Sequence, residues 1–236
     1  MKKFKRPSIT TVANLSIAFI LIGLSVVVFA TDISAIFLTV SAPVHNGNRN
    51  NQNVSIMFNV WGGNHARYIE PIMELLEEKG VGATFFVGGN WVSQNMALTK
   101  RIAEQFEIGN HAFTQSDMRT MHERTQRDEI RNTHEMIKTV TGKCTNLFAP
   151  PGGSFGRTTL RVAESFGYTT IMWSKDTIDW RDNDPDLIYF RATNNIMNGD
   201  MILMHPTAHT LAALPRILDY FAGRGFGVVR VSENIG

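Results

Sequence analysis

The sequence predicts an α/β domain built on a parallel sheet that closes toward a barrel. From about residue 54 onward, short apolar runs alternate with stretches of helical periodicity, which is typical of strands joined by covering helices. Runs such as 83–88 and 169–173 show no polar–apolar alternation, so both faces of these strands are expected to be buried. Six or seven such units follow one another, which favours a barrel-like closure over a doubly wound sheet.

The first forty residues form a hydrophobic export segment in this interpretation. A basic cluster at residues 2–6 precedes an uncharged apolar run at 12–30, which is long enough to span a bilayer. The basic residues favour a cytoplasmic N-terminus. A signal peptide cleaved near 28–30 or 40–42 fits as well as a membrane anchor. Either reading places the remainder at the outer face of the cytoplasmic membrane or in the cell wall.

Composition excludes several classes of protein. The 236 residues carry 23 Lys and Arg against 21 Asp and Glu, a net charge of +2, without the basic excess that nucleic-acid binding requires. Hydrophobic residues make up 43% of the chain and charged residues 19%, which excludes a disordered chain. The single cysteine, Cys144, excludes an internal disulfide framework.

The elements follow in order after a linker. Residues 41–53 are rich in Asn, with Pro and Gly, and are expected to be this linker; residues 54–236 form the domain. Strands are expected at 54–60, 83–88, 107–111, 146–150, 169–173, 201–205 and 227–231. Helices are expected at 69–80, 98–106, 130–142, 160–167, 186–197 and 210–223. Apolar residues at helical spacing and a terminal Gly, as at Gly80, predict these helices.

Polar residues stand where the expected strands end. They are Asn59, His111, Asp176, Asp179 and His205. A single His or Asn at a strand end commonly serves only as a cap or hydrogen-bonding group. In parallel α/β architectures, however, the carboxyl ends of the strands share one rim. Five polar positions at one rim indicate a functional site.

Six motifs carry a family resemblance that extends from about residue 54 to the C-terminus. They are SIMFNV, GATFFVGGNW, EIGNHAF, LFAPPGGSF, MWSKDTIDW and GDMILMH. Together they resemble the polysaccharide deacetylase family (NodB homology, carbohydrate esterase family 4), and most of all its YlxY-type, sporulation-associated branch. The resemblance implies a distorted (β/α) barrel. It also implies hydrolysis of N-acetyl groups from peptidoglycan or chitin-like glycans.

The resemblance implies a role for each retained position. In the family a divalent metal, usually zinc, is held by one Asp and two His, and an Asp acts as general base. His205 matches the general acid, and Asp176 matches the residue that supports this acid. His111 matches one metal ligand. Trp61, Pro150, Asp179 and Trp180 are expected to contact substrate.

The other catalytic positions depart from the family pattern. Asn59 stands at the general-base position, and an amide cannot accept a proton near pH 7. Val60 and Gln115 stand at two ligand positions, where an alkyl group cannot bind zinc and a carboxamide binds it poorly. Ala149 replaces an expected Arg. We therefore expect no cofactor; zinc or another divalent cation is implied by the resemblance alone.

Three hypotheses remain open at this point. The chain is a deacetylase-like envelope protein with lost or much reduced activity, or a non-catalytic glycan-binding or structural pseudoenzyme, or an active deacetylase with a rewired site using His65, His111 and a nearby carboxylate. The expected partners are cell-wall glycan and, through the N-terminal segment, the cytoplasmic membrane. No nucleic-acid partner is expected.

Overall fold

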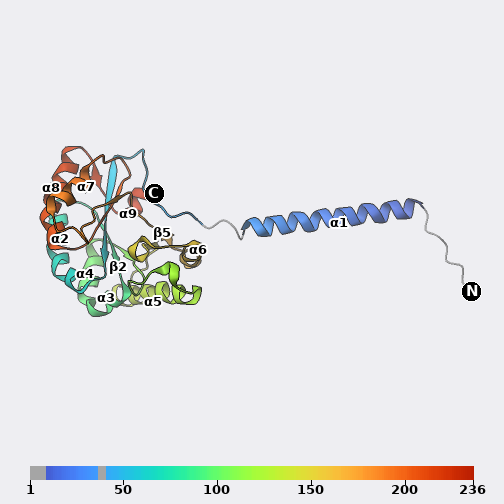
Figure 1. Ribbon diagram of the computed structural model, residues 1–236, viewed down its shortest axis with the longest axis horizontal. Helices are drawn as coiled ribbons and strands as arrows, with labels where there is room; N and C mark the ends of the chain where they lie inside the picture. The colour runs from blue at the N-terminus through green and yellow to red at the C-terminus, as the bar shows by residue number, and fades with distance from the viewer. Residues whose placement is uncertain (1–8, 37–40) are drawn as a thin grey trace, which may run out of the picture. The chain divides into compact units, whose positions relative to one another are not determined.

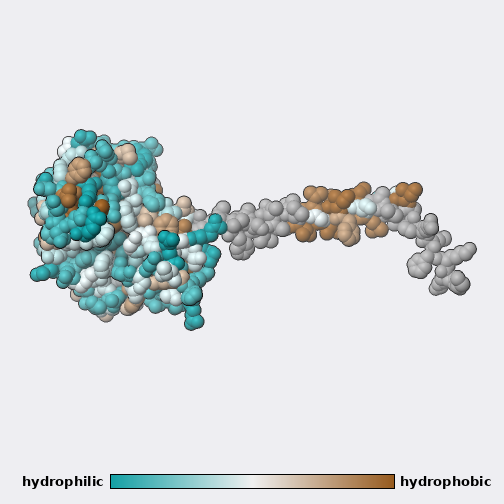
Figure 2. Space-filling view, viewed as in Figure 1, coloured by the Kyte–Doolittle hydropathy of each residue, from teal (hydrophilic) through white to brown (hydrophobic). Residues whose placement is uncertain are grey.

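The computed structural model describes residues 9–36 and 41–236 (Figure 1). The chain divides into two units, Met1–Val40 and Ser41–Gly236. In the first unit the apolar run at 12–30 lies within one helix, α1 (Ile9–Ile36), whose described side chains are largely apolar (Figure 2). Among the residues described, no helix has both the length and the apolarity needed to cross a membrane. The basic cluster at 2–6 lies outside the described residues, so anchor or signal peptide stays a prediction.

Within residues 41–236, eight parallel strands form one sheet, and helices cover its outer face (Figure 1). The strands are β1 (Asn53–Val60), β2 (Thr84–Val87), β3 (Glu107–Asn110), β4 (Leu147–Phe148), β5 (Thr169–Thr170), β6 (Lys175–Asp176), β7 (Met201–Met204) and β8 (Gly227–Val228). Their order is β5-β4-β3-β2-β1-β7-β6, with β8 beside β1. The two edge strands, β5 and β6, are joined by only residues 171–174. The barrel is therefore closed by a short chain connection, and the predicted distorted (β/α) barrel is confirmed.

The helices agree with the sequence pattern, with additions. Those of the second unit are α2 (Ala66–Glu78), α3 (Gly89–Gln94), α4 (Met96–Gln105), α5 (Glu123–Thr141), α6 (Arg157–Ser165), α7 (Pro185–Thr193), α8 (Ala208–Gly223) and α9 (Val231–Ile235), with 3-10 turns η1 (Gly63–His65), η2 (Met118–Thr120) and η3 (Pro151–Gly153). The strand expected at 227–231 was predicted too long. It ends at Val228, and Val231 begins α9 and packs in the barrel interior.

The alternation of side chains along β1 decides which residues reach the interior. Phe58 and Val60 belong to the outer apolar cluster between sheet and helices, whereas Met57 packs in the interior with Phe86 and Leu203. Successive side chains on a strand point to opposite faces. Asn59 therefore faces the interior, at the carboxyl end of the barrel, and Val60 faces the helices.

The segment expected as a linker is hydrogen-bonded to the domain. The Val44 N–H donates to the Thr170 carbonyl at 2.9 Å, and Val44 forms a parallel bridge with Ile171. Arg49 pairs with the buried Asp200 at 2.9 Å. This polar segment differs from a free linker because it binds backbone groups at the edge of the sheet, which would otherwise lack partners.

Candidate functional site

A cavity of about 460 Å³ opens at the carboxyl end of the barrel. Its walls are formed by Asn59, Trp61, His111, Gln115, Gly152, Trp173, Asp176, Trp180, Leu203 and His205. Seven of these were singled out from the sequence, and the structure brings them together. These seven residues therefore share one cavity, as the strand-end argument predicted.

His205, on the segment that follows β7, is held by Asp179. Its ring Nδ1 lies 2.8 Å from Asp179 Oδ1, and its backbone N–H donates to Oδ2 at 2.6 Å. The Thr210 hydroxyl donates to the same Oδ2 at 2.6 Å. Since the carboxylate accepts from Nδ1–H, the Nε2 atom of His205 remains available on the cavity side.

This arrangement corrects two expectations for the aspartates. Asp179, not Asp176, supports His205, and at 1% exposure it cannot contact a substrate. Asp176 instead accepts the Ile178 N–H at 2.8 Å, which stabilises the left-handed backbone of Ile178 (φ 55°). A β-branched residue rarely adopts this conformation. Burial raises the pKa of Asp176, while the bond from Ile178 opposes that shift.

His111 follows β3 and is almost fully buried. Its Nδ1 lies 2.7 Å from the Ala149 carbonyl, so Nδ1 carries the proton and donates. Its Nε2 is then the atom with a free lone pair. Burial lowers the pKa of His111 to about 3, although the bond to Ala149 opposes the shift. The ring therefore stays neutral and can offer Nε2 as an acceptor or ligand.

Glu129 on α5 fixes the loop that carries Gln115. Its carboxylate accepts the backbone N–H groups of Phe113 and Thr114 at 2.9 and 2.7 Å. The Thr114 hydroxyl donates to the same carboxylate at 3.1 Å. Gln115, four residues after His111, is thereby placed at the cavity wall. The sequence pattern had assigned no such role to Glu129.

Asn59 presents an unpaired amide at this site. It is 2% exposed and lines the cavity. Its Oδ1 is buried without a hydrogen-bond partner among the described residues. Leaving a buried amide oxygen without a hydrogen-bond partner is unfavourable, so Asn59 lowers the stability of the folded domain unless a ligand or water binds its Oδ1.

The side chains do not fit the metal that the family resemblance implies. His111 offers one imidazole, Asn59 and Gln115 offer amides, and Val60 points into the outer apolar cluster. A zinc site rests on three or four imidazole, thiolate or carboxylate ligands. Within residues 9–36 and 41–236, no three His, Cys, Asp or Glu side chains are placed to hold a metal ion.

His65 lies close to the site but does not complete a metal centre there. Its ring centroid is 6.1 Å from that of His205. Its Nδ1 faces the backbone N–H of Gly62 at 3.3 Å. Burial, and then the nearby His205, lower the pKa of His65 to about 4. The rewired site built on His65 and His111 thus gains no third ligand from the described part of the chain.

Aromatic side chains surround the mouth of the cavity. Trp61 is 45% and Trp180 58% exposed, as a sugar-stacking surface requires. Trp173, which the sequence reading missed, ends the 169–173 run and could have been found by the strand-end rule. It packs on the PPGG turn, where a Cβ on Gly153 would lie 2.6 Å from its ring. Pro150, also expected to contact substrate, is buried and is not among the residues that line the cavity.

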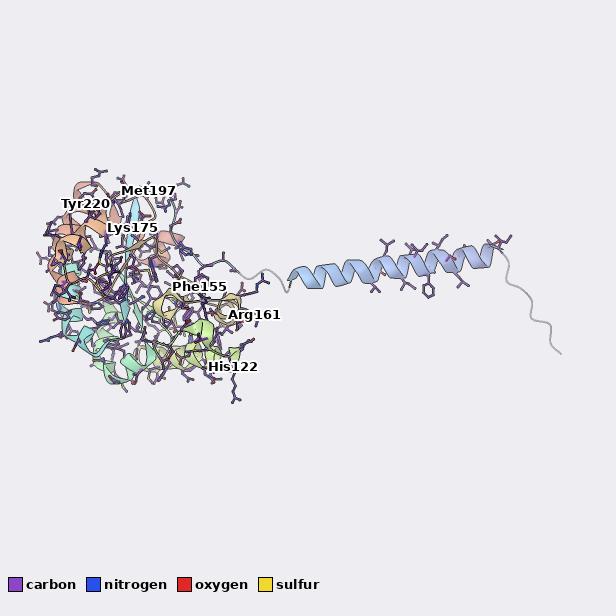
Figure 3. The ribbon with its side chains drawn as sticks, viewed as in Figure 1. His122, Phe155, Arg161, Lys175, Met197 and Tyr220 are labelled. Carbon is purple, nitrogen blue, oxygen red and sulfur yellow. The ribbon has the colours of Figure 1, made fainter. Side chains whose placement is uncertain are left out.

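Other aromatic residues take no part in the cavity. Phe155 is half-buried and is not among the lining residues; Figure 3 labels it in the second unit. Leu203, also missed from sequence, belongs to the interior cluster and forms part of the cavity wall. Because β7 pairs with β1 and Leu203 is the register partner of Met57, side-chain alternation turns Leu203 toward the interior, as it does Met57.

Comparison with known proteins identifies this arrangement. The family model for polysaccharide deacetylase matches residues 46–171. The chain belongs to the polysaccharide deacetylase family. Its resemblance to YlxY is also confirmed, because the uncharacterised YlxY protein of Bacillus subtilis is 36% identical over 192 residues, covering 81% of this chain and 60% of that protein.

Other members of the family include both enzymes and a pseudoenzyme. The peptidoglycan-N-acetylmuramic acid deacetylase PdaA of B. subtilis is 31% identical over 58% of this chain and 52% of its own length. The chain thus spans between 52% and 60% of these two curated relatives. A carbohydrate esterase family 4 pseudoenzyme from Bacillus anthracis, BA3943, has a TM-score of 0.80 at 36% identity, covering 84% of this chain and 70% of that chain.

Proposed function

We propose that residues 41–236 form a glycan-binding domain of the cell envelope with lost or much reduced deacetylase activity. The observation that carries the proposal is the chemistry of the cavity floor. Asn59 and Gln115 line the same cavity as His111 and offer two amides, and Val60 faces the helices. The described residues therefore offer neither a carboxylate at the general-base position nor a set of metal ligands.

The magnitude of these losses supports weak or absent catalysis. Hydrolysis of an amide at neutral pH needs an activated water, and removing a general base alone typically lowers the rate by about 10²–10⁴-fold. His205 and Asp179 keep the geometry of a proton donor, but a donor cannot replace the activation of water. A variant of the BA3943 pseudoenzyme with restored enzymatic activity, 34% identical to this chain with a TM-score of 0.80, supports the view that substitutions within this fold govern activity.

Glycan binding is supported by the rim and by the relatives. Trp61 and Trp180 expose flat apolar surfaces beside the cavity, and such rings bury area against sugar faces. Among the relatives is a peptidoglycan-N-acetylglucosamine deacetylase of Bacillus cereus, 30% identical over 70% of this chain and 81% of that protein. The proposed ligand is accordingly peptidoglycan or another polymer containing N-acetylglucosamine.

The proposal includes export of the domain. The apolar run at 12–30 would act as anchor or cleaved signal and place residues 41–236 at the outer face of the cytoplasmic membrane or in the wall. Resemblance to YlxY supports a role in sporulation. Fractionation of cells, with proteolysis of the intact cell surface, tests the location; retention of the domain in the cytoplasm would contradict it.

Three measurements on the purified full-length chain test the function. We expect substoichiometric zinc by elemental analysis, no acetate release from N-acetylglucosamine oligomers above background, and retention on insoluble peptidoglycan. Stoichiometric metal with brisk acetate release would establish an active, rewired enzyme instead. Absence of both turnover and retention would leave a structural role for the domain.

A further inference from the structure

A second cavity lies at the opposite end of the barrel from the cavity described above. It has a volume of about 410 Å³, and its walls come from the C-terminal ends of α7 and α8 and from the turn after α7. Both helices lead into the start of a parallel strand, β7 and β8 respectively. This cavity is therefore at the amino end of the barrel, and it shares no lining residue with the first cavity.

Four polar side chains of this second cavity have no hydrogen-bond partner within the described residues. They are Asn194, Asn195, Tyr220 and Arg224. The Arg224 guanidinium forms no ion pair with any described residue and lies over the Tyr220 ring, 5.8 Å from its centroid. Asn195 has a left-handed backbone (φ 51°), which Asn tolerates better than most residues. In the free protein these groups are bound to water, and they are available to a ligand.

Phe190 adds an exposed aromatic surface beside these polar groups. It lines the second cavity and is 56% exposed, although Phe is usually buried. A flat ring buries area against the apolar face of a sugar. Arg224 is the only charged side chain among the described lining residues, and the C-terminal ends of α7 and α8 add partial negative charge. This balance favours an uncharged ligand over an anion.

We propose that the second cavity is a separate carbohydrate site that holds uncharged sugar rings of peptidoglycan, so that one domain contacts two glycan strands. Phe190 stacks on a sugar ring, Arg224 donates to hydroxyl oxygens, and the amides of Asn194 and Asn195 donate to and accept from other hydroxyls. The choice of polymer rests on the proposed function, whereas the site itself rests on the second cavity alone. Two contacts with one polymer network raise the apparent affinity, because the chain leaves only when both are released.

The experiment measures sedimentation of the full-length chain with insoluble peptidoglycan that has been stripped of anionic phosphate polymers by hydrofluoric acid. Phe190→Ala combined with Arg224→Gln should lower the apparent affinity about 5–10-fold. Titration with a tetramer of N-acetylglucosamine, followed by tryptophan fluorescence, should be unchanged in this double variant. Three of the four tryptophans line the first cavity and none lines the second, so fluorescence reports on the first cavity.

Two further variants separate the site from general effects of charge and folding. Phe166→Ala combined with Arg157→Gln removes an exposed Phe and an exposed Arg outside both cavities, and it should leave sedimentation unchanged. Phe190→Tyr keeps the ring and should keep the wild-type affinity.

Each result decides between the two sites. Equal sedimentation of the wild type and the Phe190→Ala, Arg224→Gln variant overturns the inference while binding at the first cavity stands. A loss seen only with untreated cell wall identifies an anionic polymer as the ligand and also overturns it. If the tetramer leaves wild-type fluorescence unchanged while sedimentation still depends on Phe190 and Arg224, binding at the first cavity fails and the second site stands. A wild-type chain that does not sediment with peptidoglycan overturns both.

Discussion

Replacing Asp179 by Ala should destabilise the domain strongly, although the residue touches no substrate. Its carboxylate accepts from the His205 backbone, the His205 ring and the Thr210 hydroxyl, at 2.6, 2.8 and 2.6 Å. Alanine leaves these three donors without their acceptor in a site that is 1% exposed at Asp179. Each unsatisfied buried donor costs about 1–3 kcal/mol. Allowing for water entering from the cavity, we expect a loss of about 3–5 kcal/mol in the free energy of unfolding.

Asp176→Ala is the matched control, since both aspartates belong to one turn. Asp176 makes one hydrogen bond, to the Ile178 N–H. Burial raises its pKa, so its charged form is less favourable in the folded state than in the unfolded chain. We therefore expect a loss of about 1 kcal/mol or less. Equal losses in the two variants would refute the assignment of Asp179 as the support of His205.

The assay is urea unfolding at pH 7, followed by tryptophan fluorescence. All four tryptophans lie between residues 61 and 180, so the signal reports on the second unit alone. Asp179→Asn adds a second readout. Its amide oxygen can keep the two bonds made by Oδ2, but its NH₂ group then faces His205 Nδ1, which must become an acceptor. Nitrogen NMR should accordingly find the His205 proton on Nε2 in this variant and on Nδ1 in the wild type.

Three other changes give separate tests. Asn59→Asp combined with Gln115→His should take up more zinc, by elemental analysis after dialysis, than Asn59→Asp alone, because residues 59, 111 and 115 line the cavity whereas Val60 faces the apolar layer; zinc should also raise the melting temperature of the double variant. Full zinc uptake by the single variant would contradict the ligand assignment. The pKa of His65 is lowered to about 4, so the unfolded chain binds a proton that the folded chain does not, and the free energy of unfolding should fall as pH decreases from about 6.5 to 4. His65→Asn should reduce that slope by up to about 1.4 kcal/mol per pH unit, and an unchanged slope counts against a buried neutral ring. Trp180→Ala should weaken peptidoglycan binding about 5–10-fold through lost stacking without changing urea stability; undiminished retention would remove Trp180 from the binding surface.

Much of the fold could be predicted from sequence because strand and helix periodicities are local properties of the chain. The apolar runs at 83–88 and 201–205 became β2 and β7 with small changes in length. Segment 41–53 was harder to interpret, since its polar composition matches a linker and its hydrogen bonds form only when the sheet edge is present. Likewise Val231 reads as the end of a strand but begins α9, because the barrel interior offers its side chain a place to pack.

The sequence by itself determined which chemical groups stand at the catalytic positions, and hence that Asn59 and Gln115 bring amides where the family resemblance implies a base and a ligand. Tertiary structure decided where side chains point. Alternation along β1 turns Asn59 inward and Val60 outward, and the left-handed Ile178 places Asp179, instead of Asp176, against His205. The physical reason is that the chemical group of a side chain is a property of the residue alone. The direction in which the side chain points depends on the neighbouring strands and on a backbone conformation that is stable only in the folded protein.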